Sequence, residues 1–219
     1  MKKLLLSILF SVLYVSSASA DLGVNIGASA NAGLFAASGS ETAGTTGVAN
    51  NGTEHGAGSW GEIFVEKTFG DMFIIGASYS PTALETDTAE TAKTTTDPLN
   101  TDSKSDVTNK IQIDFEDLTT YYIGARIGEN FYAKLGTTHI QVITNESLET
   151  GSSYGNTDLD GAIFGLGYNR TNDNGTFFRF EGNYMNFDSA QLTSSANGNV
   201  VKLKNLDGVS GKLSIGKSF

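Results

Sequence analysis

The residues from Val209 to Phe219 alternate between two kinds of side chain with a period of two. Val209, Leu213, Ile215 and Phe219 share one parity, and the residues between them are small or polar. A β-strand places successive side chains on opposite faces, whereas a helix repeats every 3.6 residues. This segment is therefore predicted to be a strand with one mostly apolar face.

The same period recurs along the chain and predicts eight strands. Their expected ranges are 22–36, 59–69, 72–80, 109–128, 131–144, 158–169, 176–187 and 199–219. The fourth range is predicted to keep one parity throughout, with Ile111, Ile113, Phe115, Asp117, Thr119 and Tyr121 on one face. Turn-forming residues separate the runs, as expected for an antiparallel meander.

Long and short connections alternate between these strands. The long ones, near 38–58, 81–107, 145–157 and 188–198, are rich in small and polar residues. Alternating loop length and an even strand number are typical of outer-membrane barrels. The expected fold is all-β: an eight-stranded antiparallel up-and-down transmembrane β-barrel over residues 21–219, with both termini periplasmic. A secreted β-sandwich is the alternative.

The first twenty residues have the pattern of a secretory signal. Lys2 and Lys3 precede an apolar stretch over 4–15, and Ala18 and Ala20 form a small-residue cleavage motif. Cleavage is expected after Ala20, and a retained N-terminal anchor is the alternative. The chain has no cysteine, so disulfides do not staple the exported domain.

The charge balance excludes nucleic acid as an expected partner. The chain carries 24 acidic against 14 basic residues, a net charge of −10, whereas phosphate recognition needs a basic surface. The 26 glycines and 2 prolines suit tight turns and a fully paired sheet. Seven glycines fall on the parity expected to face the interior: Gly27, Gly76, Gly124, Gly136, Gly165, Gly167 and Gly216.

Charged residues gather on the strand face opposite the aliphatic one. In a narrow barrel they would point inward, where opposite charges can pair and side chains fill the interior. The predicted interior charge network comprises Glu62, Glu66, Arg126, Lys134, Arg179, Glu181 and Lys212. Aromatic residues are expected in two rows: Phe69, Phe73, Phe131, Tyr168, Phe178 and Phe219 near the short turns, and Tyr79, Tyr121 and Tyr184 near the long loops.

The chain resembles the small outer-membrane β-barrel family that includes OmpA/OmpX-like and opacity-type surface proteins. The resemblance rests on this architecture and on the strand ending Leu213, Ile215, Phe219, which is similar to a barrel-assembly signal. It implies location in the outer membrane of a Gram-negative bacterium. The implied partners are outer-membrane lipid and lipopolysaccharide, the barrel-assembly machinery through the C-terminal strand, and an external ligand or cell surface through the loops.

Catalytic signals are sparse, so the expected role is structural and loop-displaying (adhesion or interaction), without catalysis, cofactor or metal. His55 falls in a predicted loop without a second ligand. His139 is predicted to face Thr119, and Gln141 to face Asp117. This grouping is similar to lipid A-modifying barrels, but Gln141 stands where their nucleophile would be. A small diffusion channel through the Gly-rich interior and a lipid A-modifying enzyme are the alternatives.

Overall fold

The structure is a computed structural model that describes residues 23–70, 72–85, 88–97, 100–147 and 153–219. The predicted cleavage motif at Ala18 and Ala20 lies outside these residues. The strands are β1 (Val24–Thr42), β2 (Ala49–Phe69), β3 (Phe73–Glu85), β4 (Ala89–Asp97), β5 (Asn100–Ile127), β6 (Phe131–Ser147), β7 (Thr157–Thr171), β8 (Thr176–Phe187), β9 (Ala190–Thr193) and β10 (Val200–Ser218). None of the described residues belongs to a helix long and apolar enough to cross a bilayer.

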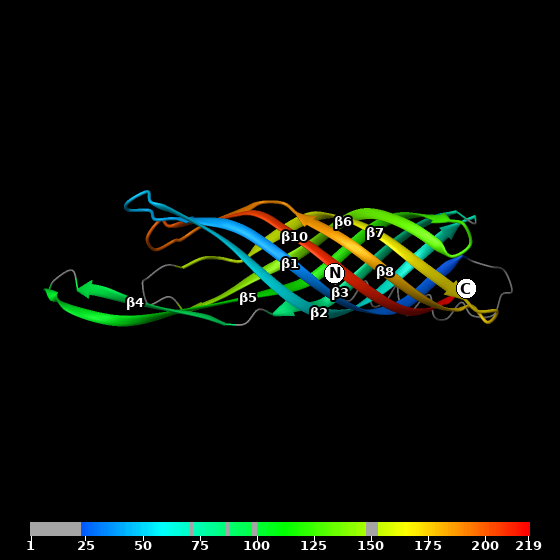
Figure 1. Cartoon of the computed structure of the whole chain (residues 1–219), viewed down its shortest axis with the longest axis horizontal. Helices are drawn as coiled ribbons and strands as arrows, with labels where there is room; N and C mark the ends of the chain where they lie inside the picture. Colours follow the sequence, from blue (N-terminus) through cyan, green and yellow to red (C-terminus); the bar gives the residue numbers. More distant parts are fainter. Residues whose placement is uncertain (1–22, 71, 86–87, 98–99, 148–152) are drawn as a thin grey trace.

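Eight strands of the described chain close into a ring. Their order is β1-β2-β3-β5-β6-β7-β8-β10, and β10 pairs back onto β1. The pairings around the ring are antiparallel. Figure 1 shows β1 and β10 side by side along the barrel wall. The predicted all-β, eight-stranded antiparallel up-and-down barrel is confirmed.

The connections at one end of the barrel are more regular than the sequence indicated. The segment expected to be a loop over 38–58 is mostly paired backbone, because β1 and β2 stay in register up to the pair Thr42 and Ala49. Within 81–107, β4 pairs with β5 and projects beyond the barrel (Figure 1). Within 188–198, β9 pairs with β10. Backbone hydrogen bonds do not need an apolar face, so polar Gly- and Thr-rich segments extend the ladders.

The expectation of one parity along the fourth predicted strand is wrong. The pairing of β5 with β6 shifts between Glu116 and Thr119, and Asp117 has φ of 53°. An extra residue in one strand of a pair is a β-bulge, and it reverses the alternation beyond it. Tyr121 therefore faces outward, whereas Phe115 lines the interior. Gln141 pairs with Glu116 and not, as predicted, with Asp117.

Aliphatic side chains form the outer face of the ring. Those at least half exposed include Ile75, Ile123, Leu135, Leu166, Leu213 and Ile215. Phe69, Phe73, Phe131 and Phe178 are exposed near the short turns, and Tyr121 and Tyr184 near the hairpins. The charged face is buried inside. The barrel is therefore inverted with respect to a soluble sandwich, whose apolar face would be covered by a second sheet.

Candidate functional site in the barrel interior

The half of the interior nearest the short turns is built around a buried ion pair. Arg179 on β8 donates from both terminal nitrogens to Glu66 on β2, at 2.6 and 2.8 Å. The Tyr122 hydroxyl donates to Oε1 of Glu66 at 2.8 Å, and the Asn25 amide donates to Oε2 at 3.2 Å. The two charged side chains are only 3% and 1% exposed. A bidentate pair with further donors gives the Glu66 carboxylate a full set of partners.

A second group of charges lies in the same half of the barrel. The Nζ of Lys134 lies 2.6 Å from Oε1 of Glu181, and the Nζ of Lys212 lies 3.8 Å from that oxygen. Lys212 also pairs with Glu62, and the Tyr132 hydroxyl donates to Glu181. We name this group together with Glu66 and Arg179 the ionic layer: Glu62, Glu66, Lys134, Arg179, Glu181 and Lys212.

Six of the seven residues predicted as an interior charge network thus lie in ion pairs across the barrel. The seventh, Arg126, is half-buried at the end of the interior and lines a small hollow with Glu129 and Arg179. It forms no ion pair with the ionic layer in the described structure. Its position explains this, because Arg126 lies one residue from the end of β5, next to the short turn.

Aromatic rings and glycines fill the space around the ionic layer. The Arg179 guanidinium carbon lies 5.3 Å from the Phe64 ring centroid, 4.9 Å from that of Tyr132 and 5.2 Å from that of Phe177. A Cβ added to Gly27 would lie 2.5 Å from the Phe64 ring, and one added to Gly216 would lie 2.3 Å from the Phe177 ring. The inward glycines therefore make room for rings, and they do not leave an open path here.

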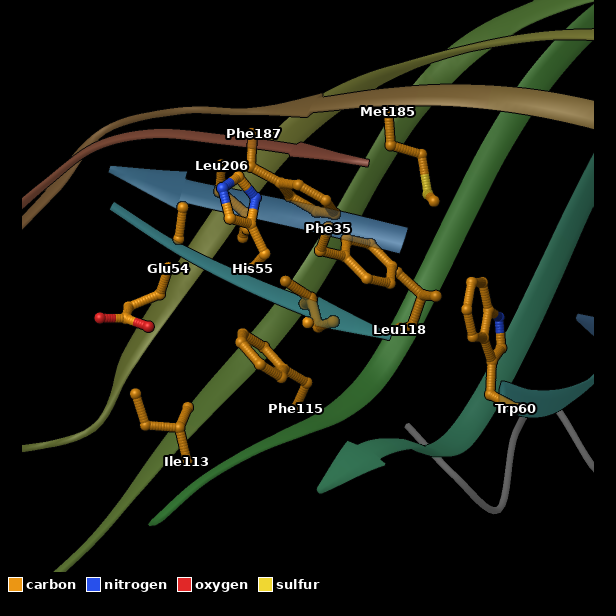
Figure 2. A pocket seen from close by; sticks show the side chains of 13 residues that line it. Phe35, Glu54, His55, Trp60, Ile113, Phe115, Leu118, Met185, Phe187 and Leu206 are labelled. Atoms are coloured by element: carbon orange, nitrogen blue, oxygen red, sulfur yellow. The ribbon is translucent and has the colours of Figure 1, made fainter. Parts of the chain in front are cut away.

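The half of the interior nearest the hairpins has a different character. A pocket of about 220 Å³ lies there, and Figure 2 shows the side chains that converge on it from several strands. Most of the lining is apolar: Phe35, Ala37, Trp60, Ile113, Phe115, Leu118, Ile140, Met185, Phe187 and Leu206. Glu54, His55 and Gly56 complete it. The ring centroids of Phe35 and Trp60 lie 5.9 Å apart.

Sequence reasoning missed this apolar pocket, although the chain carries a signal for it. Trp60 shares the inward parity of Glu62 and Glu66, and Met185 and Phe187 share that of Arg179. Apolar residues on the parity of the charges indicate that the interior changes character along the barrel. On β5 even this signal fails, because the bulge moves Phe115 to the inside.

His139 lies on the outer surface and not in the interior. It pairs with Thr119 across the β5–β6 ladder, as predicted. On its other side its Nδ1 lies 2.7 Å from Oδ1 of Asp160 on β7, and both side chains are exposed. The residue two positions on is Gln141, so no hydroxyl nucleophile stands at that position. His55 lines the apolar pocket and is itself exposed.

The residues predicted as an assembly signal lie on the ring seam. Leu213 and Ile215 point outward and are 56% and 52% exposed. The backbone N–H of Phe219 donates to the carbonyl of Val24 at 2.9 Å.

At the far end of the molecule, Lys110 Nζ lies 2.7 Å from Oε1 of Glu90 in the β4/β5 hairpin. The hydrogen bond and charge of Glu90 raise the pKa of Lys110.

No family model matches the chain, and no curated protein matches it. Among solved structures it is similar to the outer membrane protein OprG from Pseudomonas aeruginosa, at 13% identity over 89% of this chain and 96% of that one, with a TM-score of 0.49. The outer membrane protease OmpT from Escherichia coli is 9% identical over 93% and 99%, with a TM-score of 0.46. Neisserial surface protein A is 12% identical over 90% and 97%, with a TM-score of 0.39. At such low similarity, activity has to be argued from the residues of this chain.

Proposed function

We propose that this protein is an integral outer-membrane β-barrel of a Gram-negative bacterium, exported by a cleaved signal, that displays its hairpins at the cell surface without catalysis. The observation that carries the proposal is the exposed aliphatic band around a closed ring. A soluble protein rarely exposes an apolar surface of this extent. A ring has no second sheet to cover it, and closed barrels are the β-structures that satisfy their backbone in lipid.

The height of the band supports the proposal. On β10 the outward residues from Val209 to Ile215 are apolar or glycine. Asp207 bounds this run at the hairpin end, and the exposed Lys217 bounds it at the short-turn end. About 9–11 tilted strand residues cross a bilayer core. The Tyr184 hydroxyl donates to Asp207 at 2.7 Å, and Asn186 donates to the same oxygen at 2.8 Å. Tyrosine beside carboxylate and amide suits the boundary between acyl chains and lipopolysaccharide headgroups.

The lengths of the connections support one orientation of the barrel in the membrane. Short turns join β2 to β3, β5 to β6 and β7 to β8, and long hairpins occupy the other end. Outer-membrane barrels keep short turns in the periplasm and long loops outside. We therefore place the ionic layer on the periplasmic side and the β1/β2 and β4/β5 hairpins outside, where they meet an external ligand or cell surface.

The proposal is tested by protease treatment of intact cells that express the full chain with an epitope inserted at 43–48. This segment joins β1 to β2 at the proposed external end. A matched insertion at 172–174, in the β7/β8 turn, is the control. We expect cleavage of the first epitope only, and fractionation of the protein with the outer membrane. Cleavage of the second epitope alone would reverse the orientation, and recovery in a soluble fraction would refute membrane insertion.

The C-terminal strand is proposed to bring the chain to the barrel-assembly machinery. Phe219→Ala removes the ring and leaves its backbone pairing with Val24 possible. Ser218→Ala, at the neighbouring position, is the control. We expect the first variant to reach the outer membrane in clearly smaller amounts while refolding normally from denaturant in lipid. Equal amounts of both variants in the membrane would exclude Phe219 as a signal.

The absence of catalysis is tested at the pair of His139 and Asp160. We expect His139→Ala to leave the lipid A composition of expressing cells unchanged, since Gln141 offers no nucleophile. A change in acylation that depends on His139 would instead establish the lipid A-modifying alternative.

A further inference from the structure

We propose that the apolar pocket in the hairpin half of the barrel is a binding site for a small apolar molecule, a monocyclic aromatic or short aliphatic compound. The molecule would be held there and not conducted through the barrel. The pocket is the space of about 220 Å³ shown in Figure 2. This site goes beyond the display role proposed above and does not depend on it.

The chemistry of the lining selects the ligand class. Trp60, Leu118, Ile140, Met185, Phe187 and Leu206 belong to one cluster of buried apolar residues. They come from β2, β5, β6, β8 and β10, so apolar side chains face the pocket from most sides of the ring. The walls offer water few hydrogen-bond partners, so an apolar guest replaces water there at little cost in lost hydrogen bonds.

A space of this size is more than a packing defect. Protein interiors are close-packed, with few voids larger than a water molecule, and an unfilled cavity destabilises the fold in proportion to its volume. An engineered apolar cavity of roughly 150 Å³ holds benzene. The pocket here is larger, so a substituted single ring or a short alkyl chain matches its volume.

The two ends of the pocket indicate how a ligand reaches it. Glu54 and His55 line its margin, and both are exposed, so solvent reaches this side. Further along the barrel the ionic layer and the rings of Phe64 and Phe177 fill the interior. A molecule that enters from the hairpin end therefore stops above the ionic layer, which makes the pocket a closed-ended site.

The single tryptophan of the chain makes binding measurable. Trp60 is the only one, it lines the pocket, and it is 8% exposed. Bromobenzene is a suitable probe, because bromine quenches indole fluorescence at contact. The full chain, folded in lipid nanodiscs without detergent, is titrated with bromobenzene. We expect saturable quenching of Trp60.

Two substitutions on β1 distinguish binding in the pocket from partition of the probe into the lipid. Ala37→Phe adds a ring where Ala37 lines the pocket, and Ala32→Phe adds the same ring on the exposed outer face of the strand. We expect Ala37→Phe to weaken binding about tenfold or more, and Ala32→Phe to change it less than twofold. Ile140→Phe fills the pocket from β6 and replaces Ala37→Phe if that variant does not fold.

Quenching that rises linearly and equally in wild type, Ala37→Phe and Ala32→Phe would mean that bromobenzene only partitions into lipid. Saturable quenching that the pocket-filling variants leave unchanged would place the bound probe elsewhere. Either result would overturn the proposal.

Discussion

Arg179 and Glu66 are the side chains on which the interior depends most directly. Both are buried in the barrel, and each has several partners from other strands. A buried pair contributes little net stability compared with an apolar pair, but removal of one member leaves the other charge without compensation. The two residues therefore matter more for what their separate loss would cost than for the energy of their contact.

We expect Arg179→Ala to destabilise the barrel by about 3–5 kcal/mol, because Glu66 then remains buried without its bidentate partner. Replacing both residues, in Glu66→Leu with Arg179→Met, should recover most of that loss. The measurement is urea unfolding in lipid vesicles, followed by Trp60 fluorescence. If the single and double variants lose equal stability, the explanation by uncompensated charge is wrong.

Even the smallest side chain at Gly136 is predicted to destabilise the barrel. A Cβ there would lie 2.1 Å from the backbone oxygen of Tyr121 and 2.8 Å from the Cα of Tyr122. Backbone cannot move aside without breaking the β5–β6 ladder, so Gly136→Ala should cost about 1–3 kcal/mol. Gly211→Ala is the matched control, since nothing lies within 4 Å of its Cβ position. Equal unfolding midpoints for the two variants would contradict this account.

At the scale of the element, β5 shows what sequence pattern does and does not determine. The alternation correctly placed its lower part, with Tyr122 inside and Tyr121 outside. The bulge at Asp117 then exchanged the inward and outward faces of β5, and no residue before Asp117 in the sequence indicates this exchange. Asp tolerates a left-handed conformation without requiring it. Strict alternation therefore assigns the wrong face to residues beyond such a bulge. For the same reason it predicted Asp117 as the partner of Gln141, which pairs with Glu116.

The bulge makes Asp117 a sensitive position. Its φ of 53° is costly for a β-branched residue, so Asp117→Val should lose about 1–2 kcal/mol. Asp117→Asn keeps both the tolerance of this conformation and an acceptor for the Tyr79 hydroxyl, its present partner. We expect the Asn variant to unfold within about 0.5 kcal/mol of wild type. A Val variant as stable as the Asn variant would show that the backbone at 117 is unstrained.

At the scale of the whole molecule, the interior has two layers of opposite chemistry. The sequence predicted the charged layer, because its charged residues alternate along the strands with outward aliphatic residues. Six of the seven predicted charges form ion pairs in the structure. The inward parity of Trp60 and Met185 was a signal for the apolar layer, but it does not say that these residues meet Phe35 in one pocket, which depends on how the ring closes. Strand stagger across a barrel is a property of the closed ring and not of any single strand.

Because the ionic layer fills the interior, we predict that the barrel does not conduct ions. We expect no stable ohmic steps from folded wild-type protein in a planar bilayer, because Phe64, Phe177 and the ionic layer occupy the cross-section. Removing both rings, in Phe64→Ala with Phe177→Ala, tests whether these side chains form the block, and conductance should then appear. Stable steps from the wild type would favour the diffusion channel over the closed barrel.

The seam between β1 and β10 also has a kinetic consequence. Asn25 pairs with Ser218, so the last ladder joins residues from the two extremes of the described chain. Ladders between neighbouring strands close short loops, whereas this one must bring the two ends of the meander together, so we expect it to be the costliest ladder to close. Until it forms, β1 and β10 each present a row of unpaired N–H and C=O groups, the surface on which foreign strands add. We therefore expect any form in which β1 and β10 are not yet joined to be prone to aggregation, and ring closure covers both edges at once.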